Sequence, residues 1–535
     1  MKKTPPIVSL MSGLLTAASL SFIPSANAAD AGAVDAESIV QQKCVACHEV
    51  EGKTSWSRIS HQRKTPEGWL MSIARMQIMH GLKISDDERH TLVKYLADRQ
   101  GLAPSETEGA RYALERRLNT AESFESQAFT ETCARCHSGA RVMLQRRPAS
   151  EWEHLVHFHL GQWPTTEYQS LARDRDWLDL TLNEMVPELA AMLPLESKSW
   201  NEWQKSVKPD VAGNWTFAGK MPGKGEMNGV MQVVEGSKDQ FSITLTGQYA
   251  DGTSFTGTGD AILYTGYEWR ANLTVDGTPM RQIFSTAKTG EMQGRMFERE
   301  HDERGFDFSA VKQGSTEPSI LAVQPEYIKA GDTVELSIVG TGLQGDVVLG
   351  KGLTLLKDVS SDQNKRVLQV KASSSVATGA QAIHIGKASS DITVYDQVAS
   401  LKVIPAFQVA RVGGNDSSTP KIEAAFEAEA WAAGSDGVAG TADDVRIGFM
   451  PASWSVAPFD DASAADNDVH FSGRMDAASG VFTPALAGPN PERRMSTNNA
   501  GNLKVVAQVD DEGQSVTADG QLIVTIQRWN NPPIP

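Results

Sequence analysis

The chain has 535 residues, of which 22 % are charged and 40 % are hydrophobic. This composition excludes a mainly disordered chain or a collagen-like rod, and a typical size of about 150 residues per domain predicts three or four domains. Acidic residues outnumber basic ones by 66 to 50, which gives a net charge of −16. A balance this acidic argues against nucleic acid as a partner.

The first 28 residues have the pattern of an export signal. Lys2 and Lys3 form a positive start, an apolar stretch covers residues 7–23, and Ala26-Asn27-Ala28 fits a small-residue cleavage site. We therefore predict a cleaved signal peptide over residues 1–28. An uncleaved membrane anchor is the alternative, but polar residues dilute the apolar stretch. No later apolar run is long enough to span a bilayer, so we expect an exported protein without a membrane span.

Residues 29–207 have a helical pattern. Ser85-Asp86-Asp87-Glu88 is typical of a capping box at the start of a helix. A further helix is predicted over 182–193, with a kink at Pro187. Eight of the eleven histidines lie between His48 and His159, within this helical segment.

After about residue 210 the pattern changes to short β runs bounded by turns. Asp251-Gly252 and Asp276-Gly277 are hairpin signals, and Gly213-Asn214-Trp215 resembles the start of a small barrel. The predicted fold is multidomain α plus all-β, with three antiparallel β domains, each a barrel or an immunoglobulin-like sandwich. Their predicted bounds are a barrel over 208–315, an immunoglobulin-like sandwich over 316–404 and a C-terminal sandwich over 405–535. The last boundary is open between 398 and 420.

Two Cys-x-x-Cys-His strings carry the strongest chemical signal. Such a string is the attachment signature of c-type haem. Two thiols one helical turn apart can form thioethers with the haem vinyl groups, and the following histidine can then bind the iron. All four cysteines of the chain lie in these strings, so we predict two covalent haem c groups and no disulfide framework. The predicted attachment residues are Cys44, Cys47, Cys133 and Cys136, and the predicted proximal ligands are His48 and His137.

Two other kinds of site, a zinc cage and a redox pair, also use paired cysteines. A zinc cage of four cysteines does not explain why histidine follows each second cysteine. A thioredoxin-like redox pair normally accompanies a βαβ pattern, which is absent from this part of the sequence. We therefore predict a dihaem cytochrome c domain over 29–207, with haem units at about 29–118 and 119–207.

The distal iron ligands are predicted from a local repeat. Met76 follows Trp69 by seven residues on one predicted helix, and His159 follows Trp152 by seven on another. Seven residues are about two helical turns, so each pair shares a helix face. Met76 and His159 are the predicted sixth ligands. The alternatives that the sequence leaves open are Met71, Met79, His61 and His80 in the first unit and His154 and His157 in the second.

This ligand set favours electron transfer over catalysis. A His/Met first haem has a higher reduction potential than a His/His second haem, because thioether sulfur favours reduced iron. With both irons six-coordinate, neither is open to a substrate, and no catalytic residue is predicted on this chain. The loop from Asp436 to Asp444 resembles a fragment of a calcium loop, but it lacks the EF-hand spacing and is better explained as an acidic hairpin loop.

The order of these segments resembles the α subunit of quinohaemoprotein amine dehydrogenase. The resemblance covers nearly the whole chain after the signal: a dihaem block and then three β domains. The haem strings alone are not specific to this family, but the domain order is. Further stretches that carry the resemblance are Thr65-Pro66-Glu67-Gly68-Trp69, Arg75-Met76, Tyr95-Leu96-Ala97-Asp98 and Gly213-Asn214-Trp215.

The resemblance implies the haem subunit of a periplasmic heterotrimer that oxidises primary amines. The implied partners are a β-propeller subunit and a small subunit that carries a tryptophylquinone made from cross-linked Cys and Trp side chains. This chain has no cysteine to spare for such a cross-link. Its haems would take electrons from the quinone and pass them to a blue copper protein or a small cytochrome c, and the β domains would be a scaffold.

Two other functions compete with this interpretation. A self-contained dihaem enzyme of the peroxidase type would need one iron with an open or removable sixth ligand, and a high-spin spectrum would reveal it. A binding module would recognise a glycan or protein through the β domains, with the haems incidental. Two covalent haems argue against that last possibility.

Overall fold

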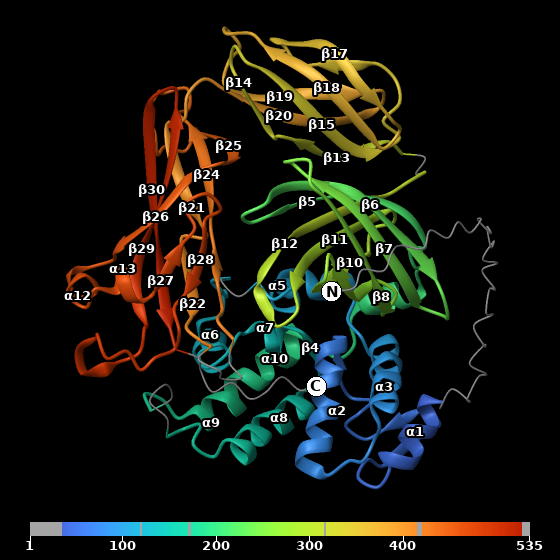
Figure 1. The fold of residues 1–535 in the computed structure, drawn as a ribbon. Coiled ribbons are helices and arrows are strands. Elements are labelled where there is room, and N and C mark those ends of the chain that lie inside the picture. The colour runs from blue at the N-terminus through green and yellow to red at the C-terminus, as the bar shows by residue number, and fades with distance from the viewer. Residues whose placement is uncertain (1–34, 118–119, 169–172, 315–316, 415–419, 527–535) are drawn as a thin grey trace, which may run out of the picture.

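The computed structural model describes residues 35–117, 120–168, 173–314, 317–414 and 420–526. The predicted signal peptide lies outside these residues. A helical block comes first, followed by an eight-stranded barrel and two further β units (Figure 1). The predicted class, a helical domain followed by antiparallel β domains, is confirmed.

The helical block contains two similar parts, which we call the first repeat (36–99) and the second repeat (127–192). The longer helices begin at ordinary capping signals: Thr65 caps α2 and Ser85 forms the predicted capping box of α3. The first repeat and its connection contain α1 (Ala36–Lys43), α2 (Pro66–His80), α3 (Asp86–Arg99), α4 (Pro104–Thr107) and α5 (Arg111–Leu114). The second repeat and its tail contain α6 (Gln127–Thr132), α7 (Ala140–Met143), α8 (Ala149–Gln162), α9 (Trp177–Leu180), a π turn (Thr181–Met185), α10 (Val186–Met192) and α11 (Lys198–Lys205).

Each repeat has its own apolar core around one tryptophan. Trp69 of α2 packs with α1 and α3 in the first repeat, and Trp152 of α8 packs with α6 and α10 in the second. Short strands form the β1–β2 pair (Val50–Gly52, Ser55–Trp56) and the β3–β4 pair (Arg63–Lys64, Gln145–Arg146). The β3–β4 pair joins the two repeats.

The barrel is closed in the order β10-β11-β12-β5-β6-β7-β8-β9. The predicted hairpin signals both lie at tight turns: Asp251-Gly252 joins β7 to β8, and Asp276-Gly277, with φ of 45° and 85°, joins β9 to β10. Aromatic rings fill the barrel interior, where Phe308 stacks on Phe217 and on Phe284. The strands are β5 (Gly213–Met221), β6 (Gly225–Glu235), β7 (Gln240–Tyr249), β8 (Ser254–Tyr264), β9 (Glu268–Val275), β10 (Thr278–Ser285), β11 (Glu291–Glu298) and β12 (His301–Lys312).

The third unit is a sandwich of two four-stranded sheets, β13-β15-β18-β17 and β14-β20-β19-β16. Both sheets are antiparallel except for the parallel pair of β14 and β20. It lies at the far side of the barrel from α2 and α8 (Figure 1). Its strands are β13 (Ser319–Gln324), β14 (Tyr327–Lys329), β15 (Thr333–Thr341), β16 (Val347–Leu349), β17 (Leu353–Ser361), β18 (Lys365–Ala372), β19 (Gly379–Ile385) and β20 (Ala388–Tyr395).

The C-terminal β unit is built from the sheets β21-β24-β25, β22-β30-β29-β26 and β23-β28-β27. Strand β21 pairs with β24, so it packs with this unit although it precedes residue 405, within the boundary range left open. The predicted acidic loop 436–444 joins β24 to β25, and its Asp443 carboxylate accepts hydrogen bonds from Ser435 and Thr441. The elements are β21 (Ser400–Ile404), β22 (Phe407–Arg411), β23 (Ala424–Ala425), β24 (Glu427–Ala432), β25 (Val445–Met450), β26 (Ser453–Pro458), α12 (Asp461–Ala465), α13 (Asp468–Phe471), β27 (Gly473–Met475), β28 (Val481–Pro484), β29 (Gly501–Asp511) and β30 (Gln514–Thr525).

The turn between β8 and β9 docks the barrel onto the helical block. Tyr267 is fully buried there, and its hydroxyl lies 3.1 Å from the Leu102 carbonyl oxygen. Beside it, Arg270 forms ion pairs with Glu67 of α2 at 2.5 Å and with Glu268 at 2.7 Å. The barrel therefore holds helix α2 from one side.

Candidate functional site

The first Cys-x-x-Cys-His string begins where α1 ends. Cys44 is the C-cap residue, and its carbonyl oxygen accepts hydrogen bonds from the backbone N–H groups of Cys47 and His48 at 3.1 and 3.0 Å. The His48 Nδ1 lies 2.9 Å from the Ser57 carbonyl oxygen. A carbonyl only accepts, so Nδ1 carries the proton and Nε2 keeps its lone pair. Iron-binding histidines are commonly oriented in this way.

The second string also begins where a helix ends. Cys133 is the C-cap of α6, and His137 Nδ1 donates to the Ser138 carbonyl oxygen at 3.0 Å. Glu122 holds the chain that follows, since its carboxylate accepts from the backbone N–H of Gly139 at 2.8 Å and from the Ser138 hydroxyl. Burial raises the pKa of the Cys133 thiol to about 11, so this cysteine is mainly a neutral thiol before any attachment.

The two tryptophan helices present the predicted sixth ligands from equivalent positions. On α2, Trp69 is buried in the first core and Met76 lies two turns further along the same face. On α8, Trp152 is buried in the second core and His159 follows at the same spacing. Both ligand candidates are half-buried.

His159 lies beside the second string. Its ring centroid is 5.7 Å from that of Trp177, and Trp177 Nε1 donates to the carbonyl oxygen of Thr132, the residue before Cys133. The His159 Nδ1 donates to the Leu155 carbonyl oxygen at 2.9 Å, which leaves its Nε2 as the available nitrogen. Burial lowers the pKa of His159, and the nearby His137 lowers it further, so the ring is neutral as a metal ligand must be.

The alternative ligands have other contacts or are exposed. The His61 and His154 rings lie 3.0 and 3.2 Å from the carboxylates of Glu51 and Glu151. Exposure is high at His157, Met79 and His80, and His157 lies 3.9 Å from Glu153. The Met71 sulfur accepts from Arg141 Nη2 at 3.1 Å, across the two repeats. Met76 and His159, which share a helix face with a core tryptophan, stay the predicted sixth ligands.

Sequence reasoning missed a set of basic residues at the contact between the repeats. Arg63 and Arg146 pair with each other in β3–β4, and both bind Glu106. The next residue in each repeat, Lys64 or Arg147, lies over the repeat's own tryptophan ring, at 5.4 and 5.6 Å. The signal was present in the sequence, because each basic pair precedes its tryptophan by the same number of residues.

Four basic side chains meet close to this pair: Lys64, Arg75, Arg141 and Arg147. Lys64 is 4 % exposed and donates to Ser72 Oγ at 2.6 Å. Burial lowers its pKa well below the ordinary value, and the three arginines lower it further. The contact of β3 and α2 with α7 and α8 therefore contains several positively charged side chains as well as apolar ones.

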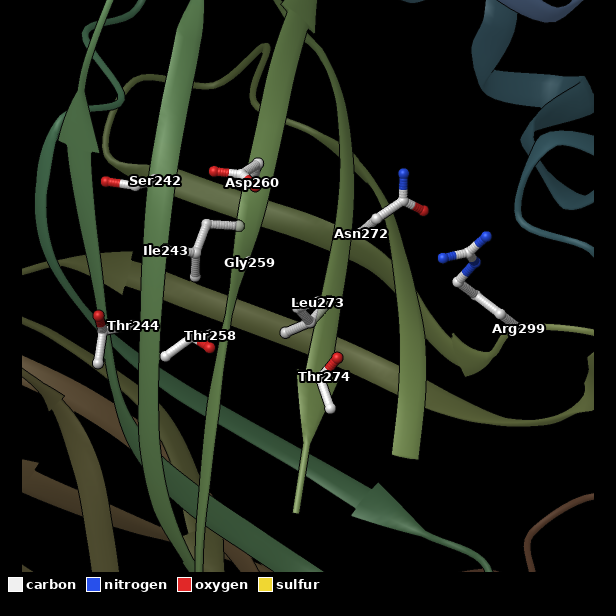
Figure 2. A pocket seen from close by; sticks show the side chains of 10 residues that line it. All are labelled: Ser242, Ile243, Thr244, Thr258, Gly259, Asp260, Asn272, Leu273, Thr274 and Arg299. Carbon is white, nitrogen blue, oxygen red and sulfur yellow. The ribbon is translucent and has the colours of Figure 1, made fainter. Parts of the chain in front are cut away.

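The barrel has a shallow polar depression on the outer side of β7, β8 and β9 (Figure 2). Asp260, Asn272 and Arg299 border it, and no cysteine or histidine is among its lining residues. Its side chains are mostly short hydroxyls and amides that point outward. The four cysteines and the predicted iron ligands all lie in the helical block.

A haem fits the donor sets of the helical block. Each string supplies two thiols and an oriented imidazole at a helix end, and each repeat adds one half-buried sulfur or nitrogen candidate on a second helix. Within the described residues, no helix is long and apolar enough to cross a membrane. These features define a haem-binding protein in which a helical block is anchored on β domains.

Comparison with known protein families shows which family of haem-binding proteins this chain belongs to. Residues 34–200 match the model described as quinohemoprotein amine dehydrogenase A, alpha subunit, haem binding. Residues 208–313, 317–396 and 401–534 match domains II, III and IV of the same subunit. The chain belongs to the family of quinohemoprotein amine dehydrogenase alpha subunits, as the sequence resemblance predicted.

A search of curated proteins finds no match. Among solved structures, the redesigned beta barrel mFAP1 bound to DFHBI is 17 % identical, with 19 % of this chain and 91 % of that chain covered and a TM-score of 0.17. Drosophila N-cadherin EC1-3 is 10 % identical, with 50 % and 86 % covered and a TM-score of 0.20. A Bacteroides ovatus glucan-utilization protein, SGBP-B in complex with a mixed-linkage heptasaccharide, is 12 % identical, with 41 % and 51 % covered and a TM-score of 0.19.

Proposed function

We propose that this chain is the dihaem electron-transfer subunit of a periplasmic amine dehydrogenase. It would receive electrons from a tryptophylquinone on a small partner subunit and deliver them to a soluble acceptor, a blue copper protein or a cytochrome c. A β-propeller subunit would complete the heterotrimer. Family membership supports the role of haem subunit in an amine dehydrogenase. The number of haems, the partners and the acceptor are part of the proposal.

The orientation of the two proximal histidines carries the proposal. His48 and His137 both direct Nδ1–H at a backbone carbonyl oxygen, one turn after a cysteine that caps a helix. Two thioether attachments would hold each haem, at Cys44 and Cys47 and at Cys133 and Cys136. When bound, haem supplies an iron that exchanges one electron at a time.

The remaining residues support transfer without substrate chemistry on this chain. Met76 and His159 would close the sixth positions, so that each iron exchanges electrons with little change in its surroundings. The quinone cross-link needs a cysteine, and all four cysteines lie in the haem strings. Amine oxidation is therefore assigned to a partner subunit.

The test is purification of the intact complex from its native host, followed by rapid mixing with a primary amine under anaerobic conditions. We expect the Soret and α bands to shift to the reduced form in the complex and to stay oxidised in the isolated chain. Mass spectrometry should find a propeller-sized chain and a small chain with a cross-linked mass. A lone chain with one high-spin haem and turnover with peroxide would instead support the self-contained dihaem enzyme.

A further inference from the structure

The contact between the two repeats contains more positive than negative charge. Lys64 and Arg147 are each 4 % exposed; Lys64 lies on β3, and Arg147 directly follows β4, in the strand pair that joins the repeats. Arg75 of α2 reaches the Phe158 ring of α8 at 4.7 Å, and Arg141 of α7 reaches back to α2. These four side chains are the basic cluster.

One carboxylate, that of Glu151, forms an ion pair with the basic cluster. Glu151 lies 3.6 Å from Arg147 and 3.1 Å from Arg58, so it is already shared. Among the described residues, no carboxylate lies within ion-pair distance of Lys64, Arg75 or Arg141. Burying a charge without a partner costs several kcal/mol by general estimates, roughly 3–5 for one broken buried pair. This cost falls on Lys64, which is buried without an opposite charge, whereas Arg75 is half-buried and Arg141 is exposed. An anionic ligand beside Lys64 would supply the missing negative charge.

A second observation also indicates a missing acceptor. Trp152 is 1 % exposed, and its Nε1–H has no hydrogen-bond partner among the described residues. The Trp152 ring lies under the Arg147 guanidinium. Its counterpart Trp69 does have a partner, the Gln100 carbonyl oxygen at 3.0 Å. Buried donors are almost always satisfied, so a ligand oxygen is expected beside Trp152.

We propose that the basic cluster and the Trp152 indole N–H bind haem propionate carboxylates. This inference rests on the proposed function, because it requires haem in the repeats. Arg75 and Phe158 directly precede the ligand candidates Met76 and His159, so the cluster lies next to both candidate iron sites. Arginine pairs with carboxylates through charge-assisted hydrogen bonds and stays charged when buried.

Positive charge at this position has a functional consequence. A fixed cation stabilises the reduced iron relative to the oxidised iron, because reduction lowers the positive charge of the haem. The cluster would also keep the propionates ionised at neutral pH, since an adjacent cation lowers a carboxyl pKa. The haem potentials should therefore be high and nearly independent of pH around neutrality.

The experiment compares Arg75→Gln and Arg141→Gln with two controls in the haem-loaded chain. Arg75→Lys keeps the charge, and Lys198→Gln removes one charge from an 89 % exposed side chain on α11. Potentials are measured by spectroelectrochemical titration at several pH values, and haem content by the pyridine haemochrome assay. We expect each glutamine variant to shift one reduction equilibrium about tenfold towards the oxidised form, about 59 mV for one electron.

The glutamine variants should also acquire a potential that falls as pH rises, because a propionate that has lost a neighbouring cation binds a proton more readily, and most readily beside reduced iron. Arg75→Lys should stay within about twofold of the parent equilibrium because it keeps the positive charge. Lys198→Gln should do the same, since surface charges are screened. Equal potentials in Arg75→Gln and Lys198→Gln at every pH, with full haem content, would overturn this inference and leave the haem function intact. If Arg75→Lys shifted the potential as much as Arg75→Gln, the effect would come from packing on Phe158 and the inference would fail. If added phosphate changed the potential of the parent chain, the cluster would bind an exchangeable anion instead of a propionate. A chain that holds no haem would refute the proposed function itself.

Discussion

Arg63 and Arg146 lie opposite each other in the β3–β4 pair, and both guanidinium groups bind the carboxylate of Glu106. Each arginine precedes its repeat's core tryptophan by six residues. Because these counterpart residues pair in an antiparallel register, a local two-fold axis of the short strand pair passes between them. Glu106 comes from the connection between the repeats and ties this strand pair together.

Replacement of Glu106 by Gln should destabilise the helical block. Arg63 contacts both carboxylate oxygens at 2.8 Å, and Arg146 contacts one at 3.2 Å. All three side chains are less than 10 % exposed, so the variant leaves two buried cations unpaired. We expect a loss of about 3 kcal/mol in urea unfolding followed at the Soret band. Glu202→Gln, on an exposed pair with Lys198, is the control, and equal midpoints for both variants would contradict the expectation.

The same carboxylate predicts an acid limit of stability. The pKa of Glu106 is about 2 against an ordinary 4.5, because the hydrogen bond from Arg63 and the charge of Arg146 outweigh the effect of burial. A depressed carboxyl pKa contributes stability that is present above pH 4.5 and is lost as pH falls towards 2, about 3 kcal/mol in total. Unfolding curves at pH 6, 4 and 3 should show this loss in the parent and a smaller one in Glu106→Gln.

Glu226 predicts the opposite dependence at the junction of the barrel with the outer β units. Burial raises its pKa to about 7, Lys220 opposes this shift, and Glu326 adds to it. A raised carboxyl pKa favours folding below pH 4.5, and that contribution is lost as pH rises through 7. Glu226→Gln should therefore be more stable than the parent at pH 8, by about 2 kcal/mol at most, and equally stable at pH 4. Calorimetry at the two pH values tests this, and an equal difference at both would contradict it.

Arg270 should hold the barrel to the helical block. Its partners are Glu67 of α2 and Glu268, and Glu268 is 2 % exposed in its side chain. Arg270→Gln should cost about 3 kcal/mol and separate the calorimetric transition of the helical block from that of the barrel. Arg299→Gln, on the outer depression of Figure 2, should leave a single profile like the parent's. Superimposable profiles for the two variants would show that the ion pairs do not couple the units.

Met76→Ala should lower the potential of one haem and open its iron to carbon monoxide. The thioether favours reduced iron, so its loss favours the oxidised form. Carbon monoxide difference spectra and a redox titration measure both effects. Met79→Ala, at a side chain that is 50 % exposed, is the matched control. A parent-like spectrum in Met76→Ala would remove this residue as a ligand.

His159→Ala should convert the other haem from low spin to high spin. The ring lies beside Trp177 with its Nε2 available, so its loss would leave the iron without a sixth ligand from α8. Electron paramagnetic resonance at low temperature separates the two spin states. His157→Ala, at an exposed neighbour on the same helix, should keep the low-spin signal. High-spin iron in both variants, or in neither, would assign the ligand elsewhere.

Several features of this protein followed from its sequence alone, because they are local. The haem strings need a fixed spacing of neighbouring residues, the capping box at Ser85 spans four residues, and the Asp276-Gly277 turn needs only its own two residues. The change from helical to β patterns placed the barrel after the helical block. The family resemblance followed from the order of these segments, and the family models confirm it.

The tertiary structure decided what distant residues do together. Glu106 meets Arg63 and Arg146 only because the two repeats pair through β3 and β4, and neither arginine had a sequence signal for that partner. Trp177 likewise contacts the His159 ring and the Thr132 carbonyl oxygen only because the fold brings α9 beside α8 and α6. Charge pairing and ring contacts depend on distances in space, which the spacing of residues along a chain does not determine beyond one or two helical turns.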